Sequence, residues 1–267
     1  MASSGSECPD APLRVEGLRP GIAAITLYRP SGPNVIDETL CDALVSACDR
    51  LAGDASLHAV LLRAHGPAFC VGADLAALQQ THADDLHGHI ERLIDHAHPA
   101  ILALRRMPIP VIACVHAAAA GGGFSLAMAC DQVMAAAPAR FVAAYPALGA
   151  SPDCGLTHTL AGRVGPRKAL DLVIDTRPLE ACQALSLGVV DEIAEGASLD
   201  DTALATALRL CGVPRPALVQ AKALFLREDL PQLASRLDQE KAAFLRCADT
   251  PEFRERLRAF NRDRRSG

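Results

Sequence analysis

Hydrophobic residues in the first two thirds of the chain follow two alternating patterns. Short continuous apolar runs predict buried strands at residues 22–28, 58–63, 111–115, 132–136 and 189–193. Between these runs, apolar residues recur at helical spacing, and residues 37–51 show this with Leu40, Leu44, Ala47 and Leu51. Asp37 is the expected N-cap of that helix. Strands that alternate with helices predict an α/β fold.

Further helices are predicted at residues 84–105, 121–129, 167–174 and 179–187. Pro99 should interrupt the first of these, and Gly188 should end the last. After residue 200 the strand pattern stops, and residues 200–267 should be helical, with turns at Pro214–Pro216 and Pro231. We therefore expect a flexible leader (1–12), an α/β core (13–200) and a helical C-terminal region (201–267).

Composition narrows the class of protein. Half of the residues are hydrophobic, but only 3% are aromatic and none is Trp, so the core should consist of Ala, Leu, Val and Ile. The formal net charge of -5 argues against nucleic acid as a partner. No apolar run approaches the roughly 20 residues that span a membrane. Ten cysteines without a CxxC pair, several in apolar runs (Cys48, Cys114, Cys130), fit reduced buried thiols. We expect a cytoplasmic protein.

Two glycine-rich segments are candidates for binding an anion through backbone N–H groups. Residues 66–75 form a loop after a strand, and residues 121–123 are three glycines that open a helix. A helix N-terminus has unpaired N–H groups and a dipole that favours negative charge. Either segment also fits a plainer role, as a tight loop or as glycines that permit close packing. Neither a Walker loop nor a dinucleotide fingerprint is present.

A third segment, residues 141–165, contains Tyr145 and the turn Ser151-Pro-Asp-Cys-Gly155. In this order and spacing, the three segments resemble the crotonase (enoyl-CoA hydratase/isomerase) superfamily. Residues 29–36 and 181–190 extend the resemblance, and the Pro-Asp-Cys-Gly wording is similar to the ring isomerase of the phenylacetyl-CoA pathway. The resemblance implies a ββα spiral core with a helical C-terminal trimerisation region.

The resemblance also implies an acyl-CoA thioester substrate, with coenzyme A as part of the substrate and no permanently bound cofactor or metal. In such enzymes two backbone N–H groups hold the thioester oxygen while an enolate forms. The matching positions here are Ala73 and Gly122. One such donor typically contributes about 3 kcal/mol to transition-state stabilisation.

Two departures from the family pattern bear on the reaction. Hydratases of the family carry two glutamates, and the corresponding positions here are Ser125 and Tyr145. Asp153 remains as an acid/base, and one carboxylate suffices to shift a double bond in an enoyl-CoA. The expected function is therefore a double-bond isomerase, although an Asx residue that caps its turn also explains Asp153.

Three alternatives remain open. The first is an enoyl-CoA hydratase. The second is a hydrolytic aryl-CoA enzyme similar to 4-chlorobenzoyl-CoA dehalogenase, with Asp153 as nucleophile, His98 as base and Tyr145 as substrate anchor. The third is an inactive acyl-CoA binder.

The other histidines in the predicted helix 84–105 and just before it have poor spacing for a metal, and a solvated or pocket-lining helix explains them: His82, His87, His89 and His96.

Coenzyme A is expected along the first glycine-rich loop, with the adenine against the backbone of Cys70, Asp74 and Leu75. Phe260 matches an aromatic position of the family near the C-terminus. Candidates for the basic residue that binds phosphate are Arg29, Lys222, Arg262 and Arg264. The resemblance implies a homotrimer or homohexamer with no nucleic acid or membrane partner.

Overall fold

Two sheets form the framework of the computed structural model, which describes residues 11–194 and 198–260. The larger sheet has the strand order β1-β2-β3-β5-β7-β10, and all neighbours are parallel except β1 and β2. Its strands are β1 (Leu13–Arg19), β2 (Ile22–Leu27), β3 (Ala59–Ala64), β5 (Val111–Val115), β7 (Gln132–Ala136) and β10 (Glu192–Ala194). The smaller sheet has the order β4-β6-β8-β9. Its strands are β4 (Ala68–Cys70), β6 (Ala118–Ala120), β8 (Arg140–Val142) and β9 (Leu179–Glu180).

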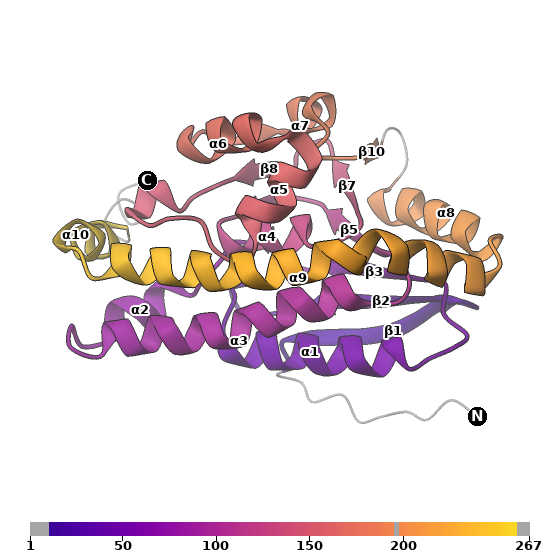
Figure 1. Cartoon of the computed structure of the whole chain (residues 1–267), viewed down its shortest axis with the longest axis horizontal. Coiled ribbons are helices and arrows are strands. Elements are labelled where there is room, and N and C mark those ends of the chain that lie inside the picture. The colour runs from indigo at the N-terminus through magenta and orange to yellow at the C-terminus, as the bar shows by residue number, and fades with distance from the viewer. Residues whose placement is uncertain (1–10, 195–197, 261–267) are drawn as a thin grey trace.

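Helices connect and cover the sheets (Figure 1). They are α1 (Glu38–Ala52), α2 (Leu75–Gln80), α3 (Leu86–Arg106), α4 (Gly122–Met128), α5 (Leu156–Val164), α6 (Pro166–Ile174), α7 (Ala181–Leu187), α8 (Leu199–Cys211), α9 (Arg215–Ala248) and α10 (Pro251–Ala259), with a 3-10 turn, η1, at Pro146–Leu148. Figure 1 shows α3 alongside α1 and α9, and these helices are in contact.

The chain winds through the sheets as a spiral of ββα units. In three successive units, β3-β4, β5-β6 and β7-β8, one strand enters the larger sheet and the next enters the smaller sheet. A helix follows each unit: α2, α4 and, after η1, α5. The expected α/β fold with a ββα spiral core and a helical C-terminal region is confirmed.

Local signals explain several of these elements. Asp37 caps α1 by accepting a hydrogen bond from the Leu40 N–H, and the predicted apolar face of α1 is buried. All five residues of β5 are buried, as expected for a parallel strand with both faces covered. The prediction of a purely aliphatic core is wrong in part, because four phenylalanines are among the largest fully buried side chains. They are Phe69, Phe124, Phe141 and Phe253.

Two prolines do not end their helices, contrary to the sequence prediction. α3 continues through Pro99, and α9 continues through Pro231. Proline removes a helical hydrogen bond, but packing stabilises both helices around it. Ile101 on α3 and Leu233 on α9 are buried close to these positions. Tertiary burial thus outweighs the local preference.

Other boundaries also differ from the prediction. Leu179–Glu180 extends as strand β9, and the predicted helix begins only at Ala181. The predicted strand 189–193 begins later, because the N–H groups of Val189 and Val190 bond back to Ala184 and close α7. The segment 66–75 contains strand β4 as well as a loop. Strands β1, β6 and β8 were not predicted.

The nine cysteines in the described part of the chain are free, and six of them are buried. Burial of Cys48, Cys114 and Cys130 is therefore confirmed. No helix in residues 11–194 and 198–260 combines the length and the apolar character needed to cross a bilayer. The predicted leader falls outside the described residues, except for residues 11 and 12.

Candidate active site

The two glycine-rich segments pack directly against each other. A Cβ on Gly72 would lie 3.1 Å from the backbone nitrogen of Gly122 and 3.0 Å from the carbonyl oxygen of Ala120. Gly72 also has a φ of +85°, a conformation that favours glycine. The loop that carries Ala73 therefore lies against the first residue of α4, as the oxyanion-hole prediction requires.

The N–H groups of Ala73 and Gly122 have no hydrogen-bond partner in the described part of the chain. Ala73 forms an isolated parallel bridge with Ile36, in which Ile36 N–H donates to Gly72 and Asp74 N–H donates to Ile36. This pattern leaves the Ala73 N–H outside the ladder. Within the described residues neither N–H donates a hydrogen bond. Unpaired amides are uncommon in folded proteins, so these two neighbouring N–H groups are candidate donors to a ligand.

The third glycine of the triplet has a packing role. A Cβ on Gly123 would lie only 2.0 Å from the carbonyl oxygen of Cys70. α4 can therefore approach β4 this closely only with glycine at position 123. The packing interpretation of the glycine triplet therefore holds at Gly123, whose close approach to Cys70 also brings Gly122 to the loop.

Ser125 and Tyr145 hold the main chain of Asp153. The hydroxyl oxygens of Ser125 and Tyr145 are 2.8 Å apart, and they lie 3.0 Å and 2.9 Å from the Asp153 carbonyl oxygen. All three residues are buried. Burial raises the pKa of Tyr145 well above its usual range, so its phenol stays protonated as a hydrogen-bond donor. The two positions thus fix Asp153 in place.

His98 contacts the Asp153 carboxylate. The His98 Nε2 lies 2.7 Å from the Asp153 Oδ1, and both side chains are buried. This contact joins α3 to the turn before α5. It places the predicted acid/base or nucleophile beside the predicted base.

Sequence reasoning missed Cys154, which lies beside the same carboxylate. Its Sγ is 3.6 Å from the Asp153 Oδ2, and burial raises the pKa of the thiol, so it remains a weak donor. Cys154 has a φ of +59°, the one positive φ outside glycine among the described residues. Such a conformation is costly for a side chain and occurs often at functional sites. The sequence shows the order Asp-Cys-Gly, but it gives no sign of the positive φ at Cys154.

The other predicted histidines lie away from Asp153. His87 pairs with Asp249, and His96 pairs with Asp42, both at the surface. His89 contacts the Thr81 hydroxyl. The described residues include no group of three or more His, Cys, Asp or Glu that could hold a metal ion. Of this histidine-rich stretch, His98 alone faces Asp153.

The model of the family described as enoyl-CoA hydratase/isomerase matches residues 17–266. The chain belongs to the enoyl-CoA hydratase/isomerase family. It is an enzyme of that family, with the fold that the sequence predicted.

Proteins named for different activities are similar to this chain. The 1,2-epoxyphenylacetyl-CoA isomerase of Escherichia coli K12 is 31% identical over 243 residues, which cover 90% of this chain and 92% of that protein. The 4-chlorobenzoyl coenzyme A dehalogenase-2 of Arthrobacter is 28% identical over 240 residues, covering 90% and 87%. A solved enoyl-CoA hydratase from Mycobacterium avium subsp. paratuberculosis K-10 has a TM-score of 0.83 at 27% identity, covering 96% and 97%.

The residues predicted to bind coenzyme A from family resemblance have diverse surroundings. Cys70 is fully buried, and its carbonyl oxygen lies against Gly123 of α4. Asp74 caps α2 through the N–H groups of Ala76 and Ala77, and Leu75 begins that helix. Arg29 forms ion pairs with Asp37 and, at 3.9 Å, with Asp74.

The predicted coenzyme A-binding residues of the C-terminal region that the structure describes have different surroundings. Phe260 follows α10, which contacts α2, and it is partly exposed. Lys222 is half-buried, and its Nζ lies 2.6 Å from Asp131 and 3.0 Å from the Ile109 carbonyl oxygen. Its ammonium group is therefore already engaged inside the protein. Arg262 and Arg264 lie outside the described residues.

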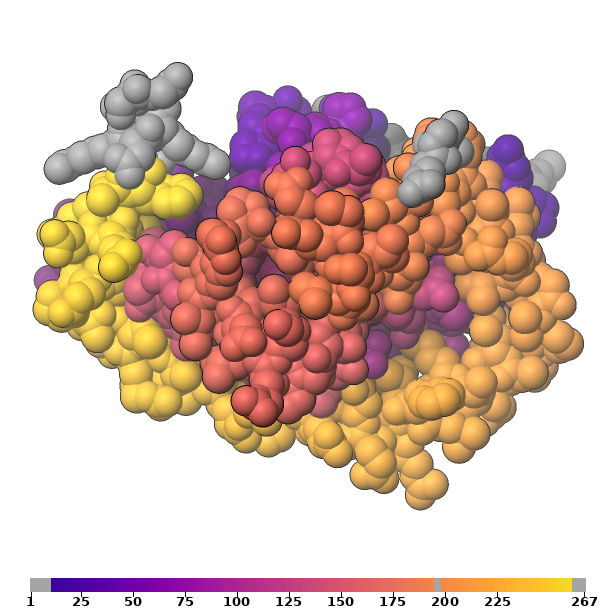
Figure 2. All heavy atoms as spheres, turned by 90° about the horizontal axis from the view of Figure 1, so that it is seen from above, coloured from indigo at the N-terminus to yellow at the C-terminus, as the bar shows by residue number. Residues whose placement is uncertain are grey.

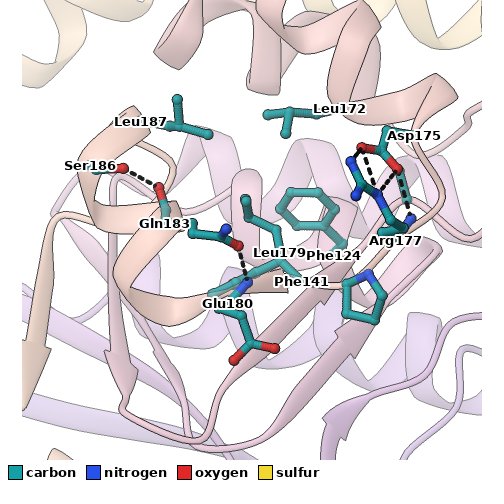
Figure 3. A pocket seen from close by; sticks show the side chains of 12 residues that line it. Phe124, Phe141, Leu172, Asp175, Arg177, Leu179, Glu180, Gln183, Ser186 and Leu187 are labelled. Atoms are coloured by element: carbon teal, nitrogen blue, oxygen red, sulfur yellow. Dashed lines mark hydrogen bonds and ion pairs between the residues drawn. The ribbon is translucent and has the colours of Figure 1, made fainter.

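A pocket of about 530 Å³ lies elsewhere in this family member, lined by residues of α4, β8, α6, β9 and α7 (Figure 3). Phe124 and Phe141 form its apolar floor, and the ion pair of Asp175 and Arg177 lies at one side. None of the predicted catalytic residues lines it. In Figure 2 the segment of α5 to α7 covers the centre of the face, between α10 and the α8–α9 region.

Proposed function

We propose that this protein is an acyl-CoA enzyme that stabilises a thioester enolate and shifts the double bond of an enoyl-CoA. The observation that carries the proposal is the pair of unpaired N–H groups at Ala73 and Gly122, next to the turn that holds Asp153. A Cβ on Gly122 would lie 3.9 Å from the Cys154 Sγ, so the amide pair and this turn are neighbours.

In the proposed reaction the two N–H groups bind the thioester oxygen. The Asp153 carboxylate takes a proton from C2 of a 3-enoyl-CoA, and the electron pair of that C–H bond delocalises to the oxygen. The protonated Asp153 then returns the proton to C4, and the double bond moves to C2–C3. The N–H groups stabilise the negative charge where it develops.

The surroundings of Asp153 support a single acid/base. Ser125 and Tyr145 occupy the positions where hydratases of the family carry glutamates, and both hydroxyls are occupied with the Asp153 carbonyl. His98 contacts one carboxylate oxygen, which fixes the orientation of the group. Among the residues that the structure describes, the other oxygen has only a weak thiol donor beside it, so it is available to accept the substrate proton.

The test is turnover of a 3-enoyl-CoA by the Asp153→Asn variant. General-base catalysis typically contributes about 10²- to 10⁴-fold, so we expect kcat to fall by that factor. KM should change little, because the two N–H groups remain. Asp42→Asn, which removes an exposed carboxylate on α1, serves as the control and should retain full activity. Full turnover by Asp153→Asn would reject the proposal.

The contact between His98 and Asp153 favours one alternative, a hydrolytic aryl-CoA enzyme. Asp153 would attack the aryl carbon and displace the leaving group, and His98 would then activate water to cleave the ester. The similarity to an Arthrobacter dehalogenase supports this alternative. A single turnover in ¹⁸O-labelled water should then label Asp153, and an unlabelled Asp153 would exclude the aryl-enzyme route.

We also propose that the protein assembles as a homotrimer or homohexamer. Large hydrophobic side chains are exposed on α6 and α9: Leu170, Ile174, Leu224 and Phe225. Exposed apolar residues in groups mark interaction surfaces. Sedimentation should give three or six times the 28.0 kDa of one chain. A monomer at micromolar concentration would contradict the assembly.

A further inference from the structure

Glu240, a residue of α9, is buried, although a glutamate side chain is usually charged at neutral pH. Its exposure is 4%. A buried carboxylate is costly unless hydrogen bonds compensate for the lost hydration. The partners of Glu240 therefore indicate what it does.

Those partners all belong to the segment that immediately follows Asp153. The Glu240 Oε2 accepts the Gly155 N–H at 2.6 Å, and the Oε1 accepts the Thr157 N–H at 2.9 Å. The Thr157 hydroxyl also contacts Oε1. Both N–H groups belong to the first turn of α5, which has no side-chain cap of its own, since Gly155 is its N-cap. Glu240 thus caps α5 from another helix.

The turn is enclosed between α9 and α3. A Cβ on Gly155 would lie 2.8 Å from Leu233 and 3.6 Å from both Leu237 and Ile101. Leu233, Leu237 and Glu240 share one face of α9, while Ile101 lies one turn along α3 from His98. Figure 1 shows α9 running between α3 and α5. Both helices therefore contact the turn with a polar side chain, His98 from α3 and Glu240 from α9.

The strain of the turn makes this support necessary. Cys154 and Gly155 both have positive φ, at +59° and +77°. Such a conformation persists where neighbouring contacts determine it. Hydroxyls hold the carbonyl of Asp153, His98 holds its carboxylate, and Glu240 holds the amides that follow.

We propose that Glu240 is a positioning residue for Asp153: its carboxylate fixes the 153–157 turn so that the Asp153 carboxylate faces the carbon next to the thioester. This inference rests on the proposed role of Asp153. Burial and the charge of Asp153 raise the pKa of Glu240, while hydrogen bonds from Thr157 and Gly155 oppose that rise. Since backbone N–H groups can only donate, both carboxylate oxygens of Glu240 must act as acceptors for the two amides.

The experiment measures deuterium uptake from solvent at the carbon next to the thioester, in four variants of the full chain. Glu240→Gln keeps the shape but turns one acceptor into a donor. We expect its maximal exchange rate to fall at least tenfold, with little change in KM, because Ala73 and Gly122 still bind the thioester. The matched control is Asp238→Asn, an exposed carboxylate two residues away on α9, which should exchange like the wild type.

The double variant Asp153→Asn with Glu240→Gln separates positioning from general destabilisation. If Glu240 acts through Asp153, the double variant exchanges at the rate of Asp153→Asn alone. If Asp153→Asn exchanges slowly, either of two results overturns the inference. One is a normal exchange rate in Glu240→Gln, and the other is a further loss of rate in the double variant. A fast Asp153→Asn variant overturns the proposed function itself and the positioning role with it. Thermal unfolding confirms that each variant is folded.

Discussion

Single glycines decide whether the Ala73 loop and α4 can approach each other closely enough for the proposed oxyanion hole. Gly72 brings the Ala73 loop onto α4, and Gly123 lets α4 approach β4. These two roles concern backbone distance, so neither depends on which acyl group the enzyme binds. The clearest prediction concerns Gly123, because an added side chain there would clash with backbone atoms, which cannot rotate away.

We predict that Gly123→Ala lowers the free energy of unfolding by about 1–3 kcal/mol, the usual cost of overpacking a core. The added methyl group would lie 2.0 Å from the Cys70 carbonyl oxygen. Urea denaturation measures the change. Gly162→Ala is the control, because nothing lies within 4 Å of that position in α5, and alanine there should raise stability slightly. An unchanged midpoint for Gly123→Ala would contradict the packing role.

Motif spacing was sufficient to single out several residues that meet around Asp153, but not to predict the contacts between them. Ser125, Tyr145 and Asp153 follow one another within 29 residues of sequence, and the resemblance assigned all three. His98 was predicted by counting from a strand. Glu240 could not be predicted, because it follows Gly155 by 85 positions and carries no motif. Its relevance depends on how α9 packs, which no local pattern records.

At the scale of elements, α3, α5 and α9 are joined by a second carboxylate, which is half-buried. Asp229 on α9 lies 2.9 Å from Arg105 on α3 and 2.9 Å from His158 on α5. Partial burial disfavours its charge, but the hydrogen bonds from His158 and Arg105 outweigh that effect and lower the pKa of Asp229 to about 2. The three helices that enclose the Asp153 turn thus share an ion-pair network.

We predict that Asp229→Asn loses stability relative to the wild type at neutral pH, and that the difference closes in acid. The lowered pKa means that Asp229 stabilises the folded state above the unfolded pKa of roughly 4. That contribution disappears as the pH falls towards about 2. Denaturation midpoints between pH 7 and pH 3 measure the difference. A difference that is constant over this range would contradict the account.

Element types were predictable where burial and periodicity agreed, as in α1, β5 and β7. They were not predictable where packing overrode a local signal, as at Pro99 and Pro231, which lie inside continuous helices. Strands of three residues such as β6, Ala118–Ala120, carry no periodic pattern at all. Such strands exist because the spiral places them beside a neighbour in the smaller sheet.

At the scale of the whole molecule, the core encloses most of the thiols. Burial raises the pKa of Cys41, Cys48, Cys70 and Cys114 to about 12 in each case. The reactive form is the thiolate, so these residues should be inert in the folded protein. Cys182 on α7 is exposed.

We therefore predict that a thiol reagent at pH 8 modifies Cys182 at least tenfold faster than Cys70 or Cys114. Peptide mapping by mass spectrometry at successive times measures the individual rates. In denaturant all three should react at similar rates, because burial no longer raises the pKa of Cys70 and Cys114. Modification of Cys114 in the native protein at the rate of Cys182 would contradict the described core.

The most direct test of the central claim is a crystal structure of the Asp153→Asn variant with a bound 3-enoyl-CoA. The account predicts that the thioester oxygen lies about 2.7–3.1 Å from the nitrogen atoms of both Ala73 and Gly122, with the side chain at position 153 beside C2. A thioester bound in the pocket of Figure 3, or one that reaches neither N–H group, would contradict it.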